Sequence, residues 1–358
     1  MRIFEQNGSD LLEGMATSMI SEEFIEEERK GLDPLLLQEL GLRPREIKML
    51  RSSFRIDEYE RTTVLKASQQ TVEDLQFIVD LQTHLLQRGF DRFSAIQRNV
   101  KSEIVLYHDQ KYWTTSTWVE GKECDYDRRR DLEATIDTIA EFHQASRGFY
   151  RPAVEHRFLW KKWPYIFQRK MEEIERSYQK ACQKERPDAF DRLYMQGASE
   201  ALEEAQGALA LLQRSTYDAI MDQEMREGGF CHHDLAHHNV IIGARGEAFL
   251  IDFDYAIQDS RLHDLGSLMI RVLKRQRWSI KKGLKIMERY HNHYPLHRTE
   301  LLLLLSFLIF PNDFWQYGWS YYFEELNRPQ EFHIKRLRRF MDRQKNRRAF
   351  LKDFAGQI

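Results

Sequence analysis

A polar loop followed by two apolar segments stands in the second half of the chain: CHHDLAHHN at 231–239, VII at 240–242, GARGE at 243–247 and FLIDFD at 249–254. The two apolar segments are predicted to pair as a β-hairpin, because the connector between them is rich in turn-forming residues. A hairpin folded about Arg245 and Gly246 places Asn239 opposite Asp252 at its open end.

This open end has the chemistry of a magnesium site. The carboxylate of Asp252 and the amide oxygen of Asn239 are hard oxygen donors, which Mg²⁺ prefers. Asp234 lies five residues before Asn239 and is placed to accept the proton of an attacking hydroxyl. Phosphoryl transfer needs little more than metal ions on the phosphates, such a carboxylate and a cation on the nucleotide.

The same loop carries four histidines, which raises zinc as an alternative. His233 and His237 have the spacing of a helical metal pair. The sequence has no HExxH pattern and no cysteine pair near them, and the neighbouring amide and carboxylate prefer a hard cation. Magnesium is therefore the favoured ion.

The rest of the chain predicts a small β-rich part followed by a large helical part. Residues 8–30 form an acidic, amphipathic opening segment with helical character. Two short helices are marked by start and stop signals: Asp33-Pro34 to Gly41, and Thr71 with Asp74 to Gly89. The predicted strands lie at 47–50, 54–56 and 62–65, with a hairpin of 104–107 and 112–119 about Asp109-Gln110. From Arg128 onward the chain is predicted to be helical except at 240–251.

Composition predicts a soluble globular protein without a nucleic-acid or membrane partner. The 358 residues are 42% hydrophobic and 31% charged, with a formal net charge of −2. The apolar run Leu301–Phe310 is too short to span a bilayer, and the acidic N-terminus is not a secretory signal. The three cysteines form no CxxC, so we expect synthesis in a reducing compartment without a disulfide framework.

Two further patterns have a plain structural interpretation. The basic run His333–Lys352 has apolar residues at helical spacing, which favours a terminal helix with a solvated basic face over a binding patch. The aromatic groups Phe314-Trp315 and Trp319–Phe323 favour core packing, with the wall of an acceptor pocket as the alternative. Trp160 and Trp163, near Arg157, are predicted to lie on a helix surface packed on the helical lobe.

A family resemblance rests on a set of motifs spread over residues 35–325. These are WVEG at 118–121, IAEFHQAS at 139–146, GF at 148–149, FCHHDL at 230–235, IDFDY at 251–255 and FP at 310–311. The set resembles the aminoglycoside phosphotransferase and choline kinase-like superfamily. It is most similar to the CotS family of spore coat-associated proteins from endospore-forming bacteria.

The resemblance implies a role for each matching residue. Asp234 would be the catalytic base, supported by His232, and Asn239 and Asp252 would bind magnesium. Asp254 would either bind a second magnesium or hydrogen-bond to the backbone of its loop. The remaining implied roles are phosphate binding by Lys66, an adenine-contacting hinge at Thr117–Val119 that includes Trp118 and Val119, and anchoring of the Asp252 loop by Asp264.

The sequence departs from the family pattern in two places. The loop expected over the phosphates, Leu50–Phe54, has no glycine, although Ser52 and Ser53 can still contact phosphate. The acid expected to pair with Lys66 on the following helix is Asp80, or Glu73 as a second candidate. Both departures bear on nucleotide affinity and turnover more than on the fold.

The resemblance implies an α+β, protein kinase-like two-lobe fold with nucleotide bound between the lobes. The expected parts are an N-terminal helical segment (1–44), a β-rich lobe (45–120), a helical lobe (121–330) and a basic terminal helix (331–358). The expected function is ATP- and Mg²⁺-dependent phosphoryl transfer to a hydroxyl-bearing acceptor, in a spore coat with other coat proteins as partners. A catalytically weak scaffold of the coat, and a kinase of amino alcohols, amino sugars or homoserine-like acceptors outside any coat, are the alternatives.

Overall fold

The chain folds into two compact units. The computed structural model describes residues 32–151, 154–324 and 328–358, so the predicted opening segment 8–30 lies outside the described residues. Unit 1 contains the described residues up to Phe158 together with Asp234–Ile257, and unit 2 contains Leu159–His233 and Gln258–Ile358. The four domain limits expected from the sequence stay a prediction.

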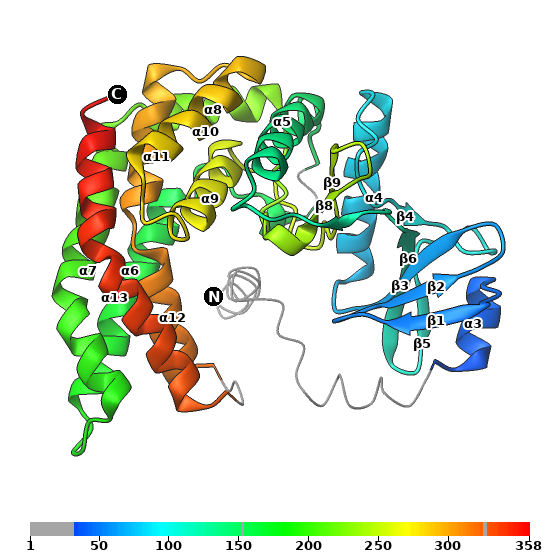
Figure 1. Cartoon of the computed structure of the whole chain (residues 1–358), viewed down its shortest axis with the longest axis horizontal. Coiled ribbons are helices and arrows are strands. Elements are labelled where there is room, and N and C mark those ends of the chain that lie inside the picture. Colours follow the sequence, from blue (N-terminus) through cyan, green and yellow to red (C-terminus); the bar gives the residue numbers. More distant parts are fainter. Residues whose placement is uncertain (1–31, 152–153, 325–327) are drawn as a thin grey trace. The chain divides into compact units, whose positions relative to one another are not determined.

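Unit 1 is built around antiparallel β-sheets (Figure 1). Its strands are β1 (Glu46–Met49), β2 (Phe54–Asp57), β3 (Thr62–Ser68), β4 (Ile96–Gln97), β5 (Leu106–His108), β6 (Lys111–Thr117), β7 (Lys122–Glu123), β8 (Val240–Ile242) and β9 (Ala248–Leu250). Its helices are α3 (Pro34–Leu40), α4 (Val72–Gln87), α5 (Arg129–Ser146) and the short η1 (Glu155–Arg157) and η2 (His237–Asn239).

The larger sheet has the order β1-β2-β3-β6-β4, with β5 also paired to β6, and β7-β8-β9 form a second sheet. The predicted hairpin about Asp109 and Gln110 is confirmed, since β5 and β6 pair there and both turn residues have positive φ. Two residues with positive φ make the turn whose twist matches antiparallel strands. The strands β4 and β7, of two residues each, were not among the predicted ones.

The two predicted short helices occur where the capping signals place them. The Asp33 side chain accepts a hydrogen bond from the Leu35 amide at the start of α3, and Gly41 ends the helix at φ 73°. Thr71 and Asp74 form the predicted reciprocal capping box at the start of α4. Apolar residues of α3 then pack on the sheet in one buried core cluster: Leu36, Leu37, Leu40, Phe54, Ile56, Leu65 and Trp113.

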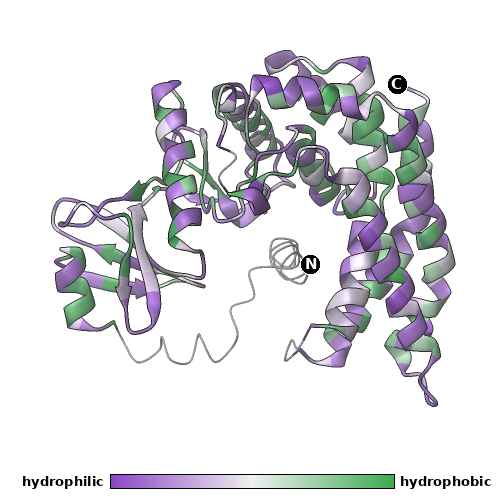
Figure 2. Ribbon diagram, turned by 180° about the vertical axis from the view of Figure 1, so that it is seen from behind, coloured by the Kyte–Doolittle hydropathy of each residue, from purple (hydrophilic) through white to green (hydrophobic). Residues whose placement is uncertain are grey.

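Unit 2 is helical in the part that the structure describes, which confirms the predicted α+β class with a mainly helical C-terminal region. Its helices are α6 (Trp163–Cys182), α7 (Ala189–Arg214), α8 (Tyr217–Glu227), α9 (Leu262–Leu273), α10 (Ile280–His293), α11 (Arg298–Ile309), α12 (Asn312–Tyr322) and α13 (Gln330–Ala355). Figure 2 shows hydrophobic and hydrophilic residues alternating along these helices, as in helices with one buried face. Among the described residues, no helix is both long and apolar enough to cross a bilayer.

The aromatic residues of α12 belong to the core of unit 2, as the sequence favoured. Phe314 is fully buried and stacks on Tyr194 of α7, with ring centroids 4.4 Å apart. Trp315 is buried as well and donates its indole N–H to Glu173 of α6 at 2.6 Å. Trp160 and Trp163 are only 2% exposed, so both are packed against the rest of the protein, and Trp163 begins α6 whereas Trp160 precedes it.

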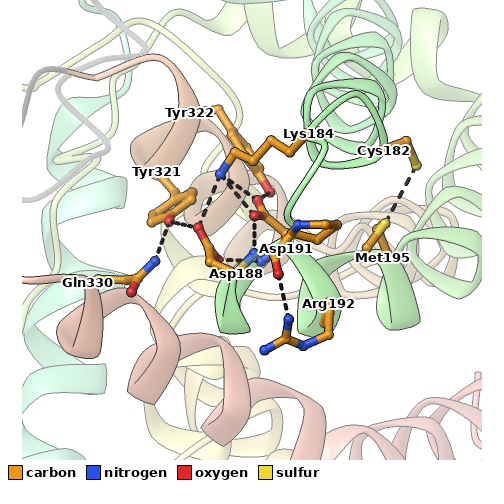
Figure 3. A network of polar contacts seen from close by, with 10 residues as sticks. Cys182, Lys184, Asp188, Asp191, Arg192, Met195, Tyr321, Tyr322 and Gln330 are labelled. Carbon is orange, nitrogen blue, oxygen red and sulfur yellow. Dashed lines mark hydrogen bonds and ion pairs between the residues drawn. The ribbon is translucent and has the colours of Figure 1, made fainter.

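A polar network fastens the α6–α7 connection to the end of α12 (Figure 3). Lys184 contacts the carboxylates of Asp188 and Asp191 at 3.2 and 2.8 Å. Tyr321 and Tyr322 donate their hydroxyls to Asp188 and Asp191, each at 2.7 Å. Since the carboxylates also cap the N-terminus of α7, one cluster of charges holds three helix ends together.

Candidate active site

Lys66 lies on β3, which contacts β6 and places Lys66 opposite Thr114. Its ammonium group is 3.0 Å from Oδ1 of Asp252 and 2.8 Å from Oδ2 of Asp254. The three side chains retain between 22% and 27% of their exposure, so solvent and ligands reach them. The structure thus brings together three of the residues singled out from the sequence.

Electrostatics tie these three groups to one another. Burial alone would lower the pKa of Lys66, but the carboxylates of Asp252 and Asp254 outweigh it and raise that pKa above its usual value. Burial, reinforced by the charge of Asp252, raises the pKa of Asp254 despite the nearby ammonium. Lys66 therefore stays charged between two carboxylates that repel each other.

The hairpin β8–β9 presents Asp252, but its register differs by one residue from the predicted one. Val240 pairs with Leu250 and Ile242 with Ala248, so the Asn239 carbonyl accepts from the Ile251 amide instead of facing Asp252. The connector closes through hydrogen bonds between Gly243, Gly246 and Glu247, with Gly246 at φ 88°, which centres the turn on Arg245. Asp252 follows at φ 63°, a left-handed conformation that is uncommon outside glycine and concentrates at functional sites.

Asn239 orients Asp234. The Asn239 side-chain nitrogen donates to the Asp234 carboxylate at 2.9 Å and to the Asp234 carbonyl at 3.0 Å. Because the nitrogen is engaged there, the amide oxygen of Asn239 faces elsewhere, and it accepts no hydrogen bond from any described residue. That oxygen is the atom that the sequence assigned to magnesium.

The pKa of Tyr255 responds to the charge of Asp234 as well as to the charges of Lys66, Asp252 and Asp254. Burial raises the pKa of the Tyr255 hydroxyl, and the charges of Asp254, Asp252 and Asp234 raise it further, while Lys66 lowers it. All four charges thus act on one hydroxyl. The sequence analysis quoted Tyr255 only as part of a family motif and gave it no role.

The backbone that leads into Asp234 is held by Asp264. The carboxylate of this residue, in the first turn of α9, accepts the backbone N–H of His232 at 2.7 Å and of His233 at 2.8 Å. It therefore anchors the histidine loop, and its expected anchoring of the loop carrying Asp252 stays a prediction. His232 is fully buried, and burial also keeps the pKa of His233 well below its usual value, so His233 is neutral.

The predicted acid partner of Lys66 is wrong in this structure. Asp80 forms an ion pair with Arg151 and accepts from Gln76, while Glu73 is exposed. The acid that α4 turns inward is Asp74, which is 4% exposed. Asp74, at the start of α4, and Asp80, nearly two turns later, have different neighbours. Sequence spacing alone does not show which of the two carboxylates is buried.

Arg157 is the functional candidate that the sequence analysis missed, since it was named there only as a neighbour of Trp160 and Trp163. It is 1% exposed, and its guanidinium donates to Asp74 at 2.5 Å and to Gln70 at 2.6 Å. The same group donates to the backbone carbonyls of Asp254 and Ala256 at 2.9 and 2.8 Å. Arg157 therefore links α4 to the loop that carries Asp252 and Asp254. No local motif marks it, because its partners lie far away in the sequence.

The predicted hinge follows β6. Within the described residues, the backbone amide of Val119 has no hydrogen-bond acceptor, while that of Trp118 donates to Thr62 at 3.3 Å. Thr117, Trp118 and Val119 border a cavity of about 910 Å³, whose other side includes Phe93 and Phe249. A planar ring has room there beside an unused backbone donor.

The glycine-free loop between β1 and β2 is a tight turn closed by a hydrogen bond from the Leu50 amide to the Ser53 carbonyl. Ser52 and Ser53 are partly buried at its tip. Arg51, which is exposed, lies 3.3 Å from Glu123 of β7. The loop thus offers serine hydroxyls and a guanidinium where a glycine-rich loop would offer backbone amides.

With this geometry in place, comparison with known proteins is informative. The family model described as "Spore coat putative kinase YutH" matches residues 35–354. The chain belongs to this family. The YutH family is CotS-like, so the resemblance inferred from the motifs is confirmed at this level.

Solved structures similar to this YutH-family chain are phosphotransferases. An aminoglycoside phosphotransferase from Alicyclobacillus acidocaldarius subsp. acidocaldarius DSM 446 shares 21% identity at a TM-score of 0.79, over 91% of this chain and 96% of its own. AMP-bound spectinomycin phosphotransferase APH(9)-Ia shares 13% sequence identity at a TM-score of 0.64, and the match covers 88% of this chain and 96% of that one. Choline kinase LicA from Streptococcus pneumoniae shares 14% sequence identity at a TM-score of 0.50, and the match covers 88% of this chain and 98% of that one. At these identities the likeness shows the fold, which is kinase-like as predicted.

The residues present fit a magnesium ion. Asp252 and Asp254 offer carboxylate oxygens and Asn239 offers its amide oxygen, a hard donor set without sulfur or imidazole. The zinc alternative loses its geometric basis, because His237 lies in a short 3₁₀ turn that does not include His233.

Proposed function

We propose that this YutH-family protein is an ATP- and magnesium-dependent phosphotransferase acting on a hydroxyl-bearing acceptor. The observation that carries the proposal is the placement of Lys66 within 3.0 Å of Asp252 and 2.8 Å of Asp254. A strand lysine and two loop carboxylates from distant parts of the sequence meet there. Nucleotide-bound structures among its neighbours support the use of a nucleotide.

The proposal gives each candidate residue a defined role. A bound magnesium ion would supply positive charge that offsets the negative charge of the phosphates. Asp252, Asn239 and Asp254 would hold this ion in place of Lys66, which pairs with both aspartates here. Lys66 would then bind the α- and β-phosphates, and Ser52 and Ser53 would contact the phosphates. The free Val119 amide, next to Trp118, binds the base.

Asp234 acts on the acceptor. Its carboxylate, held by Asn239 at 2.9 Å, accepts the hydroxyl proton while the acceptor oxygen bonds to the γ-phosphorus and the bond to the β-phosphate oxygen breaks. His232 supports the loop from its buried position. Positioning of this kind supplies most of the catalysis in phosphoryl transfer.

The family description supports a place in the spore coat, where other coat proteins would be partners. Fluorescence of a tagged copy in sporulating cells tests this placement. Signal confined to the coat is the expected result, and signal spread through the mother cell cytoplasm contradicts it.

A second candidate function is a kinase-fold scaffold of the coat with little or no catalysis. The turn without glycine over the phosphates and the pairing of Asp80 with Arg151 favour it. Such a protein keeps the fold while binding nucleotide weakly.

Thermal unfolding with magnesium and a non-hydrolysable ATP analogue separates the two candidates. The native protein should show a saturable rise in Tm that Asp252→Ala abolishes, because a ligand that binds only the folded state stabilises it. Asp342→Ala, which removes an exposed carboxylate of α13, is the matched control and should keep the rise. No rise at millimolar nucleotide overturns the enzyme proposal. A screen of amino alcohols, amino sugars and homoserine for ATP consumption then identifies the acceptor.

A further inference from the structure

A basic concavity lies in unit 2 beside α13. It encloses about 230 Å³, and α12 and the C-terminal end of α9 form its other walls. Its charged lining consists of five cations and one carboxylate: Lys274, Arg336, Arg339, Arg343, Arg347 and Asp313. The four arginines recur every three or four residues, which places them on one face of the helix.

The pairing of these cations shows which of them are available. Arg347 is buried and engaged, because it donates to the backbone carbonyls of Leu308 and Ile309 and to Glu204. Lys274 lies 3.4 Å from Asp313. Arg339 and Arg343, in contrast, have no ion pair with a carboxylate among the described residues.

The walls of the concavity keep these charges in place. The Arg336 guanidinium lies 4.7 Å from the centre of the Tyr317 ring, which holds it by a cation–π contact. The Trp278 ring, 7% exposed, lies 5.7 Å from the Arg347 guanidinium. Aromatic walls lower the local dielectric, so an anion between these arginines is bound more strongly than on an open helix face.

Other basic residues of α13 lie outside the concavity. Arg338 and Lys345 are exposed and line no part of the concavity. Arg348 is paired with Glu200 and Glu204 on another side of α13. Arg339 and Arg343, which pair with no described carboxylate, therefore border one hollow together with three further cations, a grouping that a merely solvated basic face does not require.

We propose that this hollow is a binding site for a phosphate-type oxyanion, either inorganic phosphate or the phosphoryl group of a small molecule. Guanidinium groups match phosphate oxygens through paired hydrogen bonds, and Arg339 and Arg343 are available for them. A volume of about 230 Å³ suits a phosphoryl group and is smaller than the usual site for a whole nucleotide or drug-sized ligand. The site shares no residue with the candidate active site.

The test is titration of the full-length protein with sodium phosphate against sodium chloride at matched ionic strength, followed by calorimetry and thermal unfolding. We expect saturable phosphate binding that persists in Lys66→Met, which separates it from phosphate bound at the candidate active site. The double variant R339Q/R343Q should weaken binding about tenfold or more. The matched control R338Q/K345Q removes the same charge outside the hollow and should bind as the native protein does.

A variant that is expected to bind phosphate more tightly complements this test, because a folding defect would weaken binding and could not produce the gain. Asp313→Asn removes the only carboxylate of the lining and releases Lys274, so it should tighten phosphate binding several-fold. Phosphoserine and pyrophosphate, used beside inorganic phosphate, distinguish a phosphorylated metabolite from the free ion as the preferred ligand. Absence of saturable binding, equal loss in R338Q/K345Q, or binding of polyglutamate without phosphate overturns the proposal.

Discussion

At the scale of residues, some side chains of the candidate site are neighbours in the sequence, and others are brought together only by the fold. Asn239 and Asp234 are five residues apart, so their hydrogen bond is a product of one loop. Lys66 and Asp252 are separated by 186 residues, and only the tertiary fold makes them neighbours. Lys66 pairs with carboxylates in this structure, and in the function proposed above it pairs with nucleotide phosphates instead.

Asn239 gives a prediction at this scale. Asn239→Ala removes the amide oxygen assigned to magnesium and the hydrogen bond that orients Asp234. The magnesium concentration that half-saturates nucleotide-induced stabilisation should rise by roughly 10–100-fold. Tm measured over a magnesium series at fixed nucleotide checks it, with exposed Asn346→Ala as the control. An unchanged magnesium midpoint contradicts the assignment of this residue.

At the scale of elements, Arg157 connects α4 with the loop after β9. Burial opposes the ionisation of Asp74, but His156, Arg157 and Thr71 hold the pKa of Asp74 well below its usual range. The carboxylate is therefore charged inside unit 1 and depends on its partners. α4 and the loop carrying Asp252 are held by the same guanidinium, so the positions of both depend on it.

Arg157→Gln should lower the free energy of unfolding by about 3–5 kcal/mol, because it leaves a buried carboxylate without its cation. Adding Asp74→Asn should recover part of this loss, since the unpaired charge is removed as well. Urea unfolding of the single and double variants measures the coupling. Strictly additive effects would show that the two residues do not act as a pair.

The contact between α12 and α7 supplies a second prediction for elements. A Cβ at Gly318 would clash with the hydroxyl and the ring of Tyr194, so Gly318→Ala should destabilise the protein by about 1–3 kcal/mol. Gly207 of α7 has open space at the same atom. Gly207→Ala should therefore stabilise by up to about 1 kcal/mol through helix propensity. Thermal unfolding of the two variants measures both changes in Tm. Changes of the same sign would contradict the predicted clash between a side chain at position 318 and Tyr194.

At the scale of the whole molecule, buried titratable groups couple folding to pH. His263 is 7% exposed and lies between the rings of Trp163 and Phe307. Burial, and next the charge of Lys170, lowers the pKa of His263 to about 4 from 6.5, although Asp264 opposes the shift. The folded state thus prefers the neutral imidazole.

The sign of the effect follows from this depressed pKa. Stability is fully present above about pH 6.5 and falls as the pH drops toward about 4, because the unfolded chain binds the proton first. The total loss from this one group is about 3 kcal/mol. His263→Phe should flatten the dependence of unfolding free energy on pH in this window, whereas exposed His293→Asn should leave it unchanged. If the unfolding free energy of His263→Phe still falls with pH in this window, another group causes the dependence.

The sequence by itself, through its local patterns and the family resemblance that its motifs carry, determined the class of fold and several members of the candidate site. Hydrophobic alternation and capping residues specify strands and helices through backbone hydrogen bonds, which are local, so β3, α4 and the β8–β9 hairpin could be predicted. Asp234, Asn239 and Asp252 could be predicted because each lies beside or follows a strand of the β8–β9 hairpin, and Lys66 could be predicted through the family resemblance.

The tertiary structure alone decided which charges meet. The pairing of Asp80 with Arg151, the burial of Arg157 and the clustering of arginines around a hollow involve segments far apart in the chain or the side-chain packing of several helices. The hairpin register moved by one residue because the turn geometry at Gly246 centres the connector on Arg245. Ion pairs and turns of this kind depend on distances in space and on backbone angles, and the order of residues constrains both only weakly.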